Sequence, residues 1–202
     1  MPSHRLNQAL SRALDAANNT QHLARYVERY ARQHPARLLS QNSETALSLQ
    51  RMLTHYVQLL PIVSEQLHAH CKVPQLDGPM GRLTTIICEF LETMDPQRLK
   101  YGLIGVLDKA YFGHRLWEEF HDRLRLKAGV PLIQWDLNLA NLIVHSLIGE
   151  DYANRLDMVV MEVIDSLDLN LTEWPPLNSN GAGAFQCLAM HHGLSMGLNQ
   201  TG

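Results

Sequence analysis

The chain has 202 residues, the length of one ordinary domain or slightly more. Hydrophobic residues make up 46% of it and charged residues 18%, a balance that excludes a disordered chain and is typical of a globular protein. The net charge of −3 argues against a dedicated nucleic-acid-binding protein. No stretch approaches 18 consecutive apolar residues, so the sequence predicts no membrane span.

The cysteines and the arginine content bear on the compartment. Cys71, Cys88 and Cys187 are too few and too scattered for a disulfide framework, which favours a reducing compartment. The first forty residues hold six arginines against Asp15 and Glu28, a composition that an organelle targeting segment also shows. Arginine outnumbers lysine 13 to 4 over the whole chain, so the preference for arginine is not a special feature of the N-terminal region. We therefore expect a cytoplasmic protein and keep a targeting segment as the alternative.

The first third of the chain has the composition of long helices. Glycine is absent before Gly78, and alanine, leucine, glutamine and arginine are abundant. Apolar residues recur at helical spacing over residues 6–17, resume over 23–31 and continue over 49–67. Pro61 lies inside the last of these patterns and predicts a kink or a break there.

The rest of the chain up to residue 168 also favours helices. The stretch 72–81 is rich in glycine and proline and predicts the first real loop. Four helices are expected to follow, over residues 82–94, 96–127, 135–148 and 150–167. No segment alternates polar and apolar residues in the manner of a half-buried strand, so no sheet is expected.

These patterns predict an all-α protein, an antiparallel helical bundle of six to eight helices with an irregular C-terminal tail. Residues 1–168 are expected to form the bundle domain. Residues 169–202 begin with a linker that contains proline, glycine and asparagine, and continue with weakly patterned apolar residues. We expect this tail to be ordered only if it docks on the bundle or on a second subunit.

Histidine and glutamate recur at ligand-like spacing on two predicted helices. At about 100° per residue, His114, Glu118 and His121 share one helix face, a geometry that can present metal ligands. Glu65 and His68 form a second Glu-x-x-His unit on another helix. These five residues are therefore candidate metal ligands.

Di-metal carboxylate bundles combine two such units with one glutamate from each of two other helices, and here Glu28 with Glu89 or Glu92 completes the set. The chemistry would be that of iron or manganese with open positions for dioxygen or water. The alternative is that the histidines are structural, because they flank the apolar centre of their helix and Glu118 lies nearer its charged side. That apolar centre consists of Val106, Ala110, Trp117 and Leu124.

Glycines inside the predicted 96–127 helix need an explanation, since each costs up to about 1 kcal/mol relative to alanine. Gly102 and Gly113 project onto or near the packed face, and Gly105 lies at its margin. Close approach of another helix would offset the cost, and so would a ligand held against bare backbone. We therefore name Gly102, Gly113 and Trp117 as candidate ligand-binding residues. The alternative is that Gly113 breaks one helix into two.

The tail carries soft and imidazole side chains within ten positions, which are ligands for copper(I) or zinc. No spacing among them matches a closed zinc site, so they can equally be unused residues of a tail. The cluster consists of Cys187, Met190, His191, His192 and Met196.

Charge is segregated along the chain. Residues 150–168 contain six acidic residues against Arg155 alone, whereas the first forty residues are basic. These two regions can pair within one subunit or across a dimer. The N-terminal arginines alternate with an acidic residue and lack lysine, so nucleic acid is not an expected partner.

No phosphate-binding loop, nucleophile elbow or His-Glu-x-x-His motif is present in the sequence. We therefore expect a non-catalytic helical binding or regulatory protein, a homodimer that acts on a protein partner or on a small apolar ligand between helices, with no cofactor. One alternative is a di-metal carboxylate enzyme containing iron or manganese. A second is a helical transcriptional regulator, although a turn with glycine of the kind common in DNA-reading motifs cannot lie in the first 77 residues.

Overall fold

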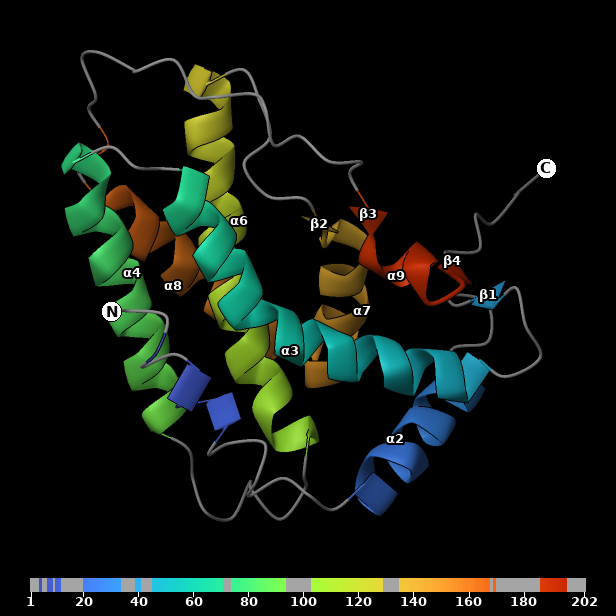
Figure 1. The fold of residues 1–202 in the computed structure, drawn as a ribbon. Helices are drawn as coiled ribbons and strands as arrows, with labels where there is room; N and C mark the ends of the chain where they lie inside the picture. The colour runs from blue at the N-terminus through green and yellow to red at the C-terminus, as the bar shows by residue number, and fades with distance from the viewer. Residues whose placement is uncertain are drawn as a thin grey trace.

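A computed structural model describes residues 4, 7–8, 10–11, 20–33, 39–40, 45–70, 74–93, 103–128, 135–167, 169 and 186–195. Within these residues seven helices pack against one another, which confirms the predicted all-α bundle of six to eight helices (Figure 1). The helices are α2 (Thr20–Gln33), α3 (Thr45–His70), α4 (Pro74–Glu92), α6 (Ile104–Ala128), α7 (Asn138–Ile148), α8 (Glu150–Asp165) and α9 (Leu188–His191).

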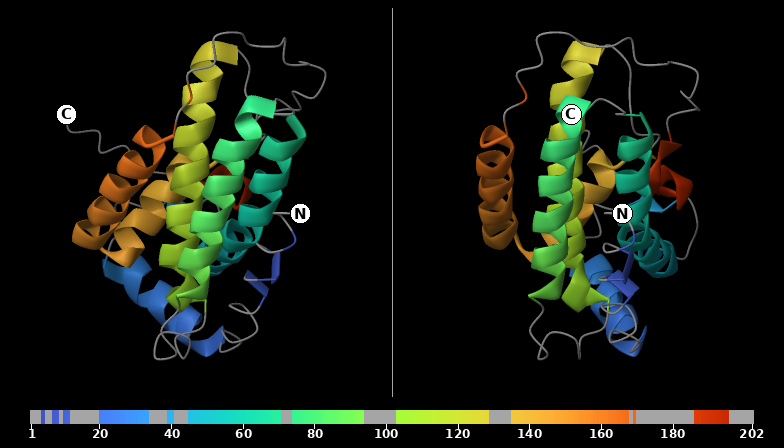
Figure 2. Two further views of the ribbon diagram at one scale, coloured as in Figure 1. Left: turned by 90° about the vertical axis from the view of Figure 1, so that its left-hand side faces the viewer. Right: turned by 60° about the vertical axis from the view of Figure 1, so that its left-hand side comes forward.

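Helix α6 is the centre of the bundle. It contacts α3, α4, α7 and α8, and in both views of Figure 2 it runs alongside α4. The four residues predicted to form its apolar centre are all fully buried: Val106, Ala110, Trp117 and Leu124. No helix among the described residues is long and apolar enough to cross a membrane.

Helix α3 contains Pro61 and nevertheless remains one helix from Thr45 to His70. Its axis changes direction along the way (Figure 1), as expected when a proline removes a backbone hydrogen bond and its ring crowds the preceding turn. The bend allows α3 to pack on α2 with one part and to follow α6 with the other.

The predicted loop over residues 72–81 is wrong from Pro74 onward, because α4 begins there. Proline is well tolerated at the first position of a helix, where its missing N–H group has no intrahelical partner. Leu76 and Met80 are buried on the face that also carries Leu83. Burial of this apolar face therefore outweighs the poor helix propensity of Gly78, Pro79 and Gly81.

Two other predicted helix starts also need correction. The helix expected from residue 135 begins at Asn138, because Trp135 and Asp136 pair with the C-terminal segment instead. The helix expected over 96–127 runs as α6 from Ile104, after a turn at Leu103, and residues 94–102 lie outside the described part of the chain. Of the helix predicted over 6–17, residues 7–8 and 10–11 are described, and they are helical.

The expectation of no sheet is wrong in a small way. Four two-residue strands form two pairs, β1 (Leu39–Ser40) antiparallel with β4 (Leu194–Ser195), and β2 (Trp135–Asp136) parallel with β3 (Gln186–Cys187). Two residues are too few to show the period-two alternation by which a strand is recognised in a sequence. Both pairs join the C-terminal segment to distant parts of the chain.

The C-terminal segment 186–195 docks on the bundle. Helix α9 contacts α3 and α7, and its residues Leu188 and Ala189 are fully buried, as is Leu194 after it. In Figure 1 and in the right-hand view of Figure 2, α9 and α8 lie on opposite sides of the bundle. The tail is expected from the sequence to be ordered only where it docks, and residues 186–195 dock on the bundle. The remaining tail residues, apart from 169, lie outside the described part.

A polar network joins four of the helices. Asn141 of α7 accepts a hydrogen bond from the Tyr56 hydroxyl at 2.7 Å and donates one to Glu118 at 2.9 Å. Arg115 of α6 binds Glu118 and also donates to Asp157 of α8 at 3.1 Å. A second ion pair, Arg123 with Asp165, also joins α6 to α8. The acidic α8 thus pairs with arginines of α6.

Gly113 marks a close helix crossing. A Cβ atom added there would lie 2.8 Å from Cδ1 of Leu60 on α3 and 3.2 Å from Cγ2 of Ile87 on α4. Helix α6 runs through Gly113 without interruption, so the alternative that this glycine breaks the helix is wrong. Close approach of neighbouring helices accounts for the glycine.

Candidate metal centre

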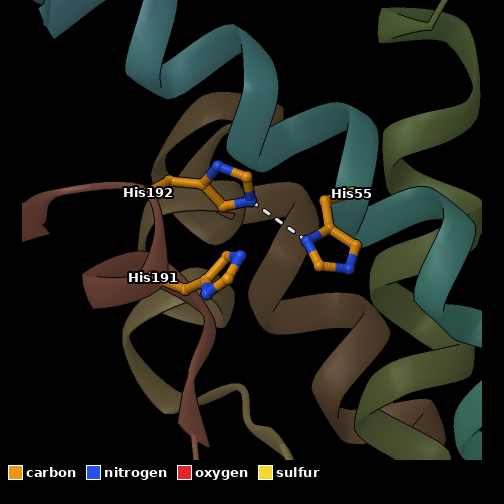
Figure 3. Close-up of side chains that lie close together, drawn as sticks. All are labelled: His55, His191 and His192. Carbon is orange, nitrogen blue, oxygen red and sulfur yellow. Dashed lines mark hydrogen bonds between the residues drawn. The ribbon is translucent and has the colours of Figure 1, made fainter.

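Three histidines from distant parts of the chain meet where the C-terminal segment docks on α3. They are His55 of α3, His191 at the end of α9 and His192 just after it, and Figure 3 shows their rings turned toward one another. One ligand nitrogen from each ring lies within 4.8 Å of the other two. We call these three residues the His triad.

The backbone explains the placement of the triad. The β2–β3 and β1–β4 pairs hold the C-terminal segment at both ends, and buried Leu188 and Ala189 seat α9 between them. This leaves His191 and His192 facing α3. His55 meets them from the flank of α3, one position before Tyr56, which points into the core and is fully buried.

His55 and His192 are in direct contact. Nδ1 of His55 lies 3.0 Å from Nε2 of His192, a hydrogen-bond distance at which one nitrogen must carry the hydrogen (Figure 3). The Trp135 ring packs edge-on against the rings of His55 and His191, at centroid distances of 5.2 and 5.7 Å. Trp135 therefore forms a wall of the site beside two of the ligand rings.

Burial and mutual proximity favour the neutral form of two triad members, His55 and His192. Burial lowers the pKa of His192 to about 4, and the nearby charges of His55, His191 and Arg51 contribute smaller effects in that order. Burial and, after it, His191 lower the pKa of His55. Imidazole must be neutral to bind a metal ion, since the lone pair that a proton would occupy is the one that the ion takes.

The geometry fits one tetrahedral ion. Zinc binds imidazole nitrogen at about 2.0–2.1 Å, which places two ligand nitrogens roughly 3.3 Å apart in a tetrahedral site. The 3.0 Å between His55 and His192 is close to that value, and no pair of ligand atoms has to approach by more than about 1.5 Å. His191 is exposed, so its side chain is free to make that adjustment.

The tail cluster predicted from the sequence is brought together in part. His191 and His192 belong to the triad, whereas Cys187 and Met190 are not members of it, and Met196 lies outside the described residues. His55 was missed. Nothing in the local sequence of α3 distinguishes it, because its relation to the tail arises from a contact across 137 positions.

The predicted ligands on α6 line one pocket. His114, Glu118 and His121 face a pocket of about 100 Å³ beside Trp135 and Asp136. Their polar atoms are largely engaged elsewhere. Glu118 binds Arg115 and Asn141, and His121 Nδ1 lies 3.3 Å from the Asp122 carboxylate.

His114 is fully buried, and its Nε2 donates to the Tyr56 carbonyl oxygen at 2.7 Å. Burial lowers the pKa of His114 to about 4, so the ring is neutral near pH 7. Its Nδ1 is buried and has no hydrogen-bond partner. Burial also lowers the pKa of His121 and raises that of Glu118.

The other predicted ligands do not line this pocket. Glu65 is exposed and accepts a long hydrogen bond from Asn7 at 3.5 Å, while His68 Nδ1 bonds to the Ser64 carbonyl oxygen at 2.7 Å. The carboxylates proposed to complete a di-metal site are all on exposed residues: Glu28, Glu89 and Glu92.

Two of the candidate ligand-binding residues are described. Trp117 is fully buried, with its ring 5.9 Å from that of His68, and Gly113 packs against Leu60 and Ile87. Gly102 lies outside the described residues. A ligand contact at these three positions stays a prediction.

Comparisons with protein-family models, with curated proteins and with solved structures find no match to this chain.

Proposed function

We propose that this chain is a helical metal-binding protein that holds one zinc ion on His55, His191 and His192. The observation that carries the proposal is the convergence of three ligand nitrogens within 4.8 Å of one another. His191 and His192 lie 136 and 137 positions after His55 in the chain, so the fold alone brings the three residues together. Three histidines are a known zinc ligand set, and they leave a fourth position for water or another small ligand.

The donor set favours zinc over harder and softer ions. Imidazole suits zinc, copper, iron and nickel, whereas magnesium and calcium require oxygen ligands, and the triad contains no carboxylate. Copper(I) prefers thiolate and thioether ligands, and neither Cys187 nor Met190 belongs to the triad. Copper(II) binds most imidazole sites more tightly than zinc does, so it is a necessary comparison in the test.

A metal ion at this place would cross-link the fold. His55 lies in the bundle, while His191 and His192 lie in a segment held by two short strand pairs and one four-residue helix. Coordination would add a strong link between these parts, as structural zinc sites do. The wider hypothesis of a non-catalytic binding protein, with its homodimer and protein partner, stays a prediction, because three histidine ligands with an open fourth position are also the arrangement of catalytic zinc sites.

The test is zinc binding by the full chain after removal of metal with a chelator. Competition with a chromophoric chelator gives the dissociation constant, and metal analysis gives the stoichiometry. We expect one zinc ion per chain. Loss of a group that supports a metal ligand typically weakens metal binding by about 10–100-fold. Loss of a ligand itself should cost more, so we expect His55→Ala and His192→Ala each to weaken zinc binding by more than about 100-fold. His4→Ala removes an exposed histidine far from the triad in sequence and serves as the matched control.

The proposal fails if the wild-type chain and the His55→Ala variant bind zinc with equal affinity and stoichiometry. Absence of zinc binding by a folded wild-type chain would also overturn it. Titration with copper(II) in parallel tests the choice of metal. If copper binds through different residues, His55→Ala and His192→Ala will bind copper as tightly as the wild-type chain does.

A further inference from the structure

The outer face of α8 carries exposed methionines. In both views of Figure 2, α8 lies at the edge of the bundle, where it packs on α6 and α7. Its inner face is buried, whereas Met158 on the opposite face is 64% exposed and Met161 is 42% exposed. These two residues lie one helical turn apart, and neighbouring exposed apolar side chains of this kind mark a surface that contacts a partner.

Helix α7 extends this apolar surface. The side chain of His145 on α7 lies 3.1 Å from that of Asn154 on α8, and Asn141 and Asp157 both bind to one ion pair of α6. Between these two places the position in α7 falls while the position in α8 rises, so the two helices run antiparallel. Leu142, which is 56% exposed, therefore lies at the level of Asp157. We call the apolar side chains exposed along the two helices the α7–α8 patch: Leu142, Met158 and Met161.

Acidic side chains border the patch on α8. Asp151, Glu162 and Asp165 lie seven positions before, four after and seven after Met158, so they share its helix face. All three are exposed. Arg155 is the basic residue of the same face, and α7 contains no Asp, Glu, Lys or Arg. The face around the methionines is therefore acidic.

The charges of the neighbouring helices do not cancel this excess. Within α8, five acidic residues stand against Arg155 alone. Arg115 and Arg123 of α6 pair with two carboxylates of α8, but Arg115 also binds two glutamates of its own helix. Arg82 of α4 donates to the Ser166 carbonyl oxygen at 3.4 Å, beyond the end of α8. Further charges of α6 in this region come as neighbours of opposite sign and add no net charge: Asp108 with Lys109, and Asp122 with Arg125.

The same features disfavour a second copy of this chain on the patch. A symmetric dimer through α8 would set the acidic face of one protomer against that of the other, and like charges at an interface oppose association. The basic helix α2 exposes Arg25 and Arg29, but its apolar residues Val27 and Tyr30 are buried in its own bundle. An occupant of the patch needs free apolar side chains together with positive charge.

We infer that the α7–α8 patch docks a basic amphipathic helix of another protein. Apolar side chains on one face of that helix would contact Leu142, Met158 and Met161, and lysines or arginines on its flanks would approach Asp151 and Glu162. Helices bind such surfaces through apolar residues at i, i+3, i+4 and i+7, and the flexible thioether of methionine adapts to their shape. The patch and α9 lie on opposite sides of the bundle, so the inference does not depend on zinc at the His triad (Figures 1 and 2).

The test uses three synthetic peptides of about 18 residues, or five helical turns. The first consists of leucine and lysine with all leucines on one helix face, the second has the same composition with the leucines spread around the helix, and the third has glutamate in place of lysine. Fluorescence anisotropy of the labelled peptides measures binding to the full chain. We expect the first peptide to bind at least about tenfold more tightly than the second, because burial of one large apolar side chain is worth about that factor. The third should not bind.

Methionine signals and variants assign the site. In the chain labelled with ¹³C at the methionine methyl groups, the first peptide should shift the signals of Met158 and Met161. Met158→Gln keeps a long, exposed side chain and removes its apolar character, so affinity for this peptide should fall about tenfold. Met190→Gln is the matched control, because Met190 is also 64% exposed and lies on α9. Glu162→Gln should weaken binding by about two- to threefold at low salt and by less at high salt.

The inference is overturned if the second peptide binds as tightly as the first, since net charge alone would then explain the attraction, or if the third binds best. Absence of binding by the first peptide overturns it as well. So does binding that leaves both the Met158 and Met161 signals and the affinity of Met158→Gln unchanged. Light scattering tests the other occupant, because a dimer of the free chain that Met158→Gln dissociates would assign the patch to a second copy and overturn the inference.

Discussion

Nδ1 of His55 lies 3.0 Å from Nε2 of His192, although 137 positions separate the two residues in the chain. This contact places the candidate metal centre at the junction of the bundle and the C-terminal segment.

Zinc should stabilise the folded chain through the His triad. An ion that binds only the native state at 100 times its dissociation constant adds about 2.7 kcal/mol to the free energy of unfolding. For a chain of this length the gain corresponds to a rise of roughly 5–10 °C in Tm. Thermal unfolding with and without zinc measures the shift. His192→Ala should abolish it and His4→Ala should retain it, and a shift that persists in His192→Ala would place the ion elsewhere.

Two glycine-to-alanine substitutions should change stability in opposite directions. In Gly113→Ala, the new methyl group would lie 2.8 Å from Cδ1 of buried Leu60, and overpacking of this kind costs 1–3 kcal/mol. The gain in helix propensity returns up to about 1 kcal/mol, so we expect a net loss of about 1 kcal/mol.

Gly81→Ala is the matched comparison, because an added Cβ there meets no atom within 4 Å outside its own stretch of α4. We expect it to gain about 0.5–1 kcal/mol from helix propensity alone. Chemical denaturation of both variants measures the two differences. An increase in stability for Gly113→Ala would show that α3 and α4 yield easily at this crossing.

The hydrogen bond between Tyr56 and Asn141 should appear as a coupling energy. Both residues are buried, and the Tyr56 hydroxyl donates to the Asn141 side chain at 2.7 Å. Tyr56→Phe and Asn141→Leu each leave a buried polar group unpaired, at a cost of about 1–3 kcal/mol. The double variant should cost less than the sum, with a coupling of about 1 kcal/mol.

A double-mutant cycle of unfolding free energies measures this coupling. Tyr152→Phe combined with Asn141→Leu is the control, since the Tyr152 hydroxyl bonds to Asp108 instead. Additive effects for Tyr56 and Asn141 would mean that the bond contributes nothing in solution.

His114 should make the fold sensitive to mild acid. Burial lowers the pKa of His114 to about 4, below the ordinary value of 6.5 that applies in the unfolded chain. The unfolded state therefore binds the proton more readily, and stability falls as the pH drops from about 6.5 to about 4. His114 alone should account for a loss of about 2 kcal/mol between pH 7.5 and 5.

His114→Gln removes this titration and keeps an N–H group for the Tyr56 carbonyl oxygen. We expect the variant to show a smaller loss of stability over the same pH range. Because His121 also has a lowered pKa, the measured quantity is the difference between wild type and variant. Equal losses in the two proteins would contradict a neutral buried His114.

The sequence alone determined the fold class, because helical periodicity is a local property that each segment carries. The buried stripe of Val106, Ala110, Trp117 and Leu124 could be predicted, and it is fully buried in the structure. The helix over Glu150–Asp165 was predicted within two residues. Local propensity failed at Gly78 and Pro79, where burial of Leu76 and Met80 makes a helix of a stretch that looks like a loop.

The meeting of distant residues was decided only by the tertiary structure. The sequence drew attention to His191 and His192, since soft and imidazole side chains cluster there, but it contained no sign of His55. Periodicity shows which face of each helix is buried. It does not show which faces meet, because that depends on the bend of α3 and on the packing of all helices around α6.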